Sequence, residues 1–126
     1  MTCRQRAAEL RAREDRHYNC CQSVLVPFGE ENGLDHEELC RLTVHFGGGM
    51  RRGAVCGAVT GGLMALGLSG TGEETALEFQ RRFEERAGGM DCSELLRLAE
   101  ERGEERKHAC DALVDLAVGL VEELIR

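Results

Sequence analysis

FGGGMRRGAVCGAVTGGLMALG, residues 46–67, contains eight glycines and one cysteine. Its three consecutive glycines can adopt positive φ without a Cβ clash, so we expect a preceding helix to end there in a sharp turn. The next helix is predicted to begin near Arg52. Within it Gly53, Gly57 and Gly61 recur every fourth residue, which leaves a strip without side chains. A second helix can pack closely against such a strip.

Cys56 is predicted to project from the first turn of this helix. Unpaired amide N–H groups and the helix dipole favour an anion at that place, and Arg51 and Arg52 come just before it. The thiol of Cys56 should therefore ionise more readily than a free thiol. The alternative interpretation is a buried helix crossing in which the glycines serve packing alone and Cys56 is a small apolar filler.

The whole chain has 126 residues, which suits a single domain with a core of ordinary size. It has one proline and no tryptophan, and aromatic residues make up only 4%. Long runs of Glu, Arg, Leu and Ala favour helices over strands. The sequence therefore predicts an all-α fold, a compact bundle of about five to six helices in one domain.

Capping residues and apolar periodicity locate these helices. We expect helices at 2–17, from 20, at 36–46, from about 52, from 72 to 87, shortly after 91, and at about 104–125. Asn19, Asp35 and Asp91 are the expected N-caps. Pro27 predicts a kink or an early break. The third helix should bury Leu39, Leu42, Thr43 and Phe46.

Charge and hydropathy exclude several classes of partner. The formal net charge is −7 and the isoelectric point is about 5.1, which argues against a nucleic-acid partner. No apolar run approaches the roughly 18–20 residues of a membrane span, so we expect a protein that is not membrane-embedded. The first 15 residues are charged and resemble no secretory signal. These features predict a cytoplasmic protein.

Seven cysteines are unusual for a chain in a reducing compartment. There, thiols serve as metal ligands, redox-active groups or plain buried residues more often than as structural bridges. No CxxC pair is present, so zinc-ribbon and ferredoxin spacings are absent. Like Cys56, Cys20 and Cys92 are predicted at helix starts, and Cys110 lies on the apolar face of the last helix. Cys3 is expected to be an exposed thiol at a frayed end, and Cys40 a packed small residue.

Taken together, YNCCQSV at 18–24, the triple glycine, CGAVTG at 56–61 and two later single cysteines resemble the C_GCAxxG_C_C family. The resemblance extends from about residue 7 to residue 124. It places the four cysteines of the family on Cys20, Cys56, Cys92 and Cys110. Cys21 departs from the pattern, because members commonly have a small residue such as alanine there. Cys3 and Cys40 match nothing in it.

The resemblance implies a redox-active protein without naming a substrate. Members are often encoded near transporter genes, which implies a partner in a membrane transport system. A similar region occurs in split-Soret cytochromes, but this chain has no CxxCH sequence, so no covalent haem is expected.

Three hypotheses remain open. In the first, a thiolate of Cys56 or Cys20 attacks a disulfide or oxidant and a second cysteine resolves the mixed disulfide, with a redox partner that the sequence does not identify. In the second, Cys20, Cys56, Cys92 and Cys110 bind an iron–sulfur cluster or zinc. In the third, the cysteines are inert and the chain is a non-catalytic interaction module. The glycine strip could also pack against a second copy and form a homodimer.

Overall fold

The computed structural model describes residues 1–125, and these form seven α-helices. They are α1 (Cys3–Ala12), α2 (Cys20–Glu31), α3 (His36–Thr43), α4 (Gly57–Leu68), α5 (Glu73–Ala87), α6 (Cys92–Glu101) and α7 (Arg106–Leu124). The predicted all-α class is confirmed, with one helix more than the upper end of the predicted range. Among the described residues, β-type pairing is limited to one antiparallel bridge between Val55 and Asp91.

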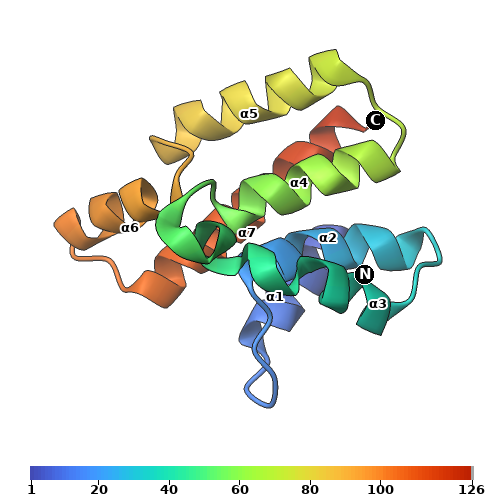
Figure 1. Ribbon diagram of the computed structural model, residues 1–126, viewed down its shortest axis with the longest axis horizontal. Helices are drawn as coiled ribbons and strands as arrows, with labels where there is room; N and C mark the ends of the chain where they lie inside the picture. Colours follow the sequence, from blue (N-terminus) through green and yellow to red (C-terminus); the bar gives the residue numbers. More distant parts are fainter. Residues whose placement is uncertain (126) are drawn as a thin grey trace.

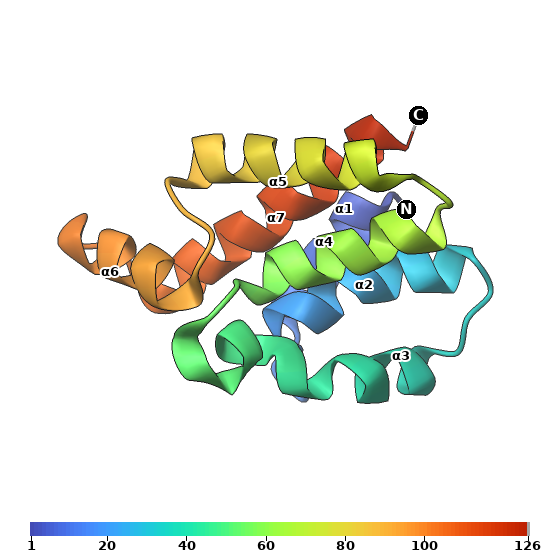
Figure 2. The same cartoon turned by 45° about the horizontal axis from the view of Figure 1, so that its top comes forward.

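Helix α2 lies at the centre of the bundle. It contacts α1, α3, α4 and α7, and every residue from Cys21 to Gly29 is buried. Figures 1 and 2 show α5 and α4 on one side of it and α3 on the other, while α6 lies at one end of the molecule. Helix α7 contacts α1, α2, α4, α5 and α6 and completes the core. None of the helices in residues 1–125 is long and apolar enough to cross a bilayer.

The predicted close helix crossing is present between α2 and α4. A Cβ atom at Gly61 would lie 2.8 Å from the carbonyl oxygen of Cys21, and one at Gly57 would lie 3.0 Å from the amide nitrogen of Cys21. Gly53 does not belong to this strip, contrary to prediction. It adopts a φ of +72° in the preceding loop, where it faces Ser93.

The positive φ predicted for the triple glycine is present at Gly48 and Gly49, and the left-handed turn extends beyond them to Met50 and Arg51, which the sequence did not indicate. Gly48, Gly49, Met50 and Arg51 all have φ between 61° and 64°. Helix α4 therefore begins at Gly57 and not near Arg52. The left-handed conformation costs roughly 1–2 kcal/mol at each residue with a side chain, so the fold maintains a strained connection here.

Other predicted boundaries also need correction. Helix α1 ends at Ala12, and its start is firmly packed: Cys3 is only 3% exposed and donates a hydrogen bond to Glu31 (Sγ to Oε2, 3.2 Å). Helix α2 runs through Pro27 to Glu31, so the early break predicted there is absent. Helix α3 ends at Thr43 and a short 3₁₀ turn (Val44–Phe46) follows it. Leu39 and Thr43 are buried as predicted, whereas Leu42 is exposed and Phe46 is only half-buried. Cys40 is packed as predicted.

Candidate functional site

The four cysteines singled out from the sequence line a single cavity of about 580 Å³. Each comes from the N-terminal part of a different helix: Cys20 is the first residue of α2, Cys56 precedes α4, Cys92 is the first residue of α6 and Cys110 lies in the second turn of α7. Cys56 is buried, and the other three are half-buried. All seven cysteines of the chain carry free thiols. Cys3, Cys21 and Cys40 do not line the cavity.

Asn19 fixes the position of Cys20. Its side chain accepts a hydrogen bond from the Gln22 amide at 2.8 Å, and the Gln22 side chain accepts one from the Asn19 amide at 2.8 Å. This reciprocal pair is a capping box, and it confirms Asn19 as the predicted N-cap. The Asn19 side chain also donates to the carbonyl oxygen of Thr43 at 3.2 Å. The start of α2 is thereby tied to the end of α3.

Backbone pairing brings Cys56 and Cys92 to the same place. The Cys56 amide donates to the Met90 carbonyl at 2.8 Å, and the Cys92 amide donates to the Ala54 carbonyl at 2.7 Å. These two hydrogen bonds flank the bridge between Val55 and Asp91. Both cysteines therefore lie on one face of a short antiparallel ladder, although 35 residues separate them in sequence.

Gly49 makes this arrangement possible. A Cβ atom at Gly49 would lie 2.4 Å from the Ala54 carbonyl oxygen and 2.7 Å from the Cβ atom of Cys92. Only glycine fits at this approach, and its φ of +64° excludes most side chains in any case. The triple glycine predicted as a simple helix stop therefore also seats Cys92 against the loop.

Arg11 connects α1 to the site. Its side chain is only 8% exposed and bonds Asp111 through Nε at 2.7 Å. Its Nη1 donates to the carbonyl oxygen of Tyr18 at 2.8 Å. Asp111 is the neighbour of Cys110 on α7, so this buried guanidinium links the segment before Cys20 to the helix that carries Cys110. Sequence reasoning did not identify Arg11, because an arginine in a charged helix carries no signal of burial.

Cys20 and Cys110 line the same cavity, and each thiol shifts the pKa of the other. Hydrogen bonding to Cys110 and burial raise the pKa of Cys20. The pKa of Cys110 is lowered, first by the hydrogen bond from Cys20 and further by the positive charges of Arg11 and Arg106. Of the two thiols, Cys110 is the one that forms the thiolate.

The prediction that Cys56 or Cys20 has the readily ionised thiol is wrong. Burial raises the pKa of Cys56 to about 11, although the backbone amides of Ala58 and Val59 lower it. The predicted helix N-terminal effect is thus present, but desolvation outweighs it. Burial also raises the pKa of Cys92 and brings that of Cys21 to about 12.

The same four thiols were predicted as alternative metal ligands, and their spacing bears on that hypothesis. Within residues 1–125, no three Cys, His, Asp or Glu side chains have the spacing needed to hold a metal ion. The thiols in this arrangement therefore do not fit a zinc site, which requires four ligands about one ion. An iron–sulfur cluster stays a prediction that chemical analysis can test.

One comparison with known proteins gives a match. The sequence profile of the family described as "Putative redox-active protein (C_GCAxxG_C_C)" matches residues 18–124. No curated protein and no solved structure matches the chain. The matched range includes all four helix starts that supply the cavity cysteines.

Proposed function

The chain belongs to the C_GCAxxG_C_C family, and from this premise we propose that it carries out thiol–disulfide exchange at the cysteine-lined cavity. Cys110 is the attacking thiol and Cys20 the resolving thiol. The observation that carries the proposal is that these two half-buried thiols line one cavity together with Cys56 and Cys92. A thiolate with a neighbouring thiol that can resolve it is the arrangement that exchange requires.

The reaction begins with a disulfide R–S–S–R as the oxidant. The Cys110 thiolate attacks one sulfur, a bond forms between Cys110 and that sulfur, and the other half leaves as a thiolate. Cys20 then loses its proton and attacks the Cys110 sulfur, which forms a Cys20–Cys110 disulfide and releases the second half. Two protein thiols are oxidised and one disulfide is reduced to two thiols.

Cys56 and Cys92 form a second pair in this proposal, which takes over the disulfide from Cys20 and Cys110. Cys56 is only 3% exposed, so a bulky disulfide reaches it less easily than it reaches Cys110. Cys56 attacks Cys20 of the new disulfide and frees Cys110, and Cys92 then attacks Cys56 and frees Cys20. The product is a Cys56–Cys92 disulfide, and Cys20 and Cys110 are again thiols. The redox partner remains unidentified. A partner in a membrane transport system and a homodimer stay predictions.

The first experiment is anaerobic purification with analysis of iron, sulfide and zinc, followed by titration with a small disulfide and peptide mapping. We expect metal-free protein in which the first disulfide formed joins Cys20 to Cys110. Cys20→Ser should trap the mixed disulfide on Cys110, and Cys110→Ser should slow the reaction at least about tenfold. Cys40→Ala, outside the cavity, is the matched control and should react normally.

Two outcomes would refute this assignment. Stoichiometric iron and sulfide bound through the four cysteines would replace exchange by cluster binding. A first bridge that excludes Cys110, or equal rates for Cys110→Ser and Cys40→Ala, would show that Cys110 is not the attacking thiol.

A further inference from the structure

The cysteine-lined cavity is rich in positive charge, although the chain as a whole has a net charge of −7. Four cationic residues line it, against two carboxylates. The cations are Arg11, Arg13, Arg106 and Lys107, and the carboxylates are Glu14 and Glu105. Arg11 and Lys107 are paired with Asp111, and Arg13 with Asp15, so Arg106 is the one cation of this lining without an ion pair among the described residues.

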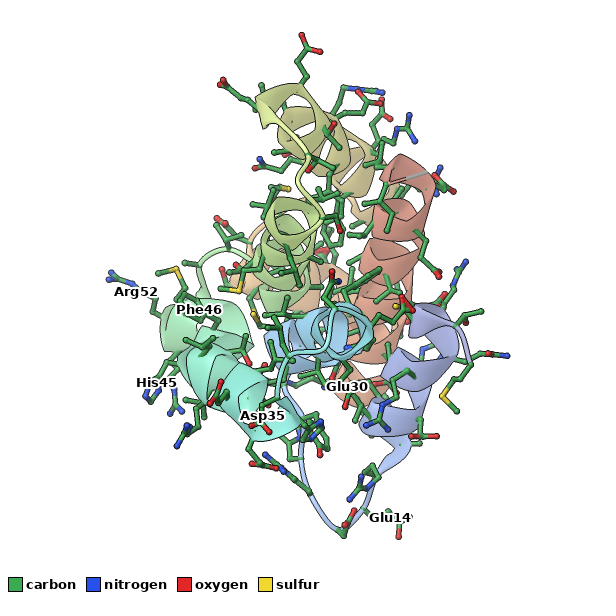
Figure 3. All side chains as sticks on the ribbon, turned by 90° about the vertical axis from the view of Figure 1, so that its right-hand side faces the viewer. Glu14, Glu30, Asp35, His45, Phe46 and Arg52 are labelled. Carbon is green, nitrogen blue, oxygen red and sulfur yellow. The ribbon has the colours of Figure 1, made fainter. Side chains whose placement is uncertain are left out.

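A second hollow, the arginine cleft, adjoins the cavity and contains no carboxylate. It has a volume of about 710 Å³, and four arginines line it: Arg16, Arg51, Arg52 and Arg106. Arg106, His17, Asn19 and Gly48 line both the cleft and the cavity, so the two hollows are adjacent. Figure 3 shows Arg52 pointing outward at the same edge of the molecule as His45.

Two of these arginines have no partner within the described residues. Arg52 and Arg106 form neither an ion pair nor a hydrogen bond there, whereas Arg16 is paired with Glu37 at 2.6 Å and Arg51 is held by the Val44 carbonyl at 3.4 Å. The strained left-handed turn includes Arg51 and immediately precedes Arg52. Uncompensated guanidinium groups beside a cavity attract anions, and they bind carboxylates well because of their planar donor geometry.

We propose that the substrate of the thiol pair is a small disulfide that carries carboxylate groups, with its sulfur–sulfur bond in the cavity and its carboxylates in the arginine cleft. This inference rests on the proposed exchange reaction and names its substrate class. A cavity of about 580 Å³ has the size of a small-molecule site. The bonds made and broken are those of the exchange reaction above.

The test compares two aromatic disulfides that differ in charge, the anionic dithiobis(nitrobenzoate) and the neutral dithiodipyridine. Each rate is divided by the rate of the same reagent with a free small thiol, which removes the intrinsic reactivity of the reagent. We expect the normalised rate to favour the anionic disulfide about tenfold at low ionic strength. The preference should shrink in about 1 M salt, where the Debye length is only ~3 Å.

Arginine variants locate the effect. Arg52→Gln and Arg106→Gln should each lower the anionic preference about three- to tenfold, as expected for loss of one charge near a dianion. Arg81→Gln on α5 changes the net charge equally but lies outside both hollows, so it should keep the full preference. Using the ratio of the two rates removes any general effect of Arg106 on the reactivity of Cys110.

The outcomes separate this inference from the proposed function. If the wild-type protein reacts at Cys110 with both reagents but shows no anionic preference, the substrate assignment is overturned and exchange survives. An equal loss of the anionic preference in Arg52→Gln and Arg81→Gln would also overturn the substrate assignment, because the preference would then come from net charge alone. If neither reagent yields a Cys20–Cys110 bridge, the proposed function itself fails.

Discussion

Replacing Gly61 by alanine tests whether the approach of α4 to α2 is as close as the structure shows. Alanine is favoured over glycine inside a helix by about 1 kcal/mol. At Gly61, however, the new Cβ atom would lie 2.8 Å from the Cys21 carbonyl oxygen and 3.1 Å from the Cβ atom of Val24. The first of these is backbone, so one helix must move, and overpacking of this kind costs roughly 1–3 kcal/mol.

Gly67 supplies the matched control in the same helix. A Cβ atom there would meet no atom within 4 Å, so Gly67→Ala should gain only the helix propensity of alanine over glycine, about 1 kcal/mol. Because that gain is common to both variants, Gly61→Ala should be less stable than Gly67→Ala by the packing cost, about 1–3 kcal/mol. Urea unfolding followed by far-ultraviolet circular dichroism measures the difference.

Equal stability of the two variants would refute the close approach. The same comparison extends to the site, since Cys20 begins α2 and Cys56 precedes α4. A forced shift between the helices should slow the reaction of the thiols with dithiodipyridine in Gly61→Ala and leave it unchanged in Gly67→Ala.

Three further predictions concern stability. Met50→Gly should stabilise the fold by about 1 kcal/mol, because it relieves the φ of 61° at a half-exposed side chain; a loss of stability in urea unfolding would contradict the left-handed turn. Asn19→Ala should cost about 1–2 kcal/mol through loss of the α2 cap, and an unchanged urea midpoint would disprove that role. The pKa values of Cys3 and Cys21 are raised from 9.0 to about 12, so the stability they contribute is present below pH 9.0 and is lost as the pH rises toward about 12. The urea midpoint should fall over that window, and less steeply in Cys3→Ala; parallel slopes would contradict a buried thiol at Cys3.

Local sequence signals predicted the helices that have polar caps and regular apolar spacing. Asn19 followed by Gln22 marks the start of α2, and Gly88 stops α5 in the left-handed conformation with a φ of 90°. The Cys3 error was avoidable, since Cys3 extends the i, i+4, i+7 row formed with Ala7 and Leu10, all three of which are buried.

Other features depend on tertiary contacts that one sequence does not reveal. The glycines signal the start of the left-handed turn, but Met50 and Arg51 are poor candidates for positive φ, so the predicted helix was extended back through the end of the turn. The four cysteines grouped from the sequence line one cavity, but their pKa values depend on burial and on the proximity of Cys20 to Cys110, which the sequence does not give. The cationic lining joins α1, α7 and two loops, and only the folded chain brings these together.

The two backbone hydrogen bonds beside Val55 and Asp91 also make the chain easy to re-engineer. They close the segment that contains α4 and α5 without using any side chain, so this helical hairpin is fastened at its base. Its far end, the turn at 69–72, has two glycines at which a Cβ atom would meet nothing within 4 Å. A reporter domain or a binding peptide inserted at Gly70 should therefore leave the cysteine-lined cavity assembled and the reactivity of its thiols unchanged.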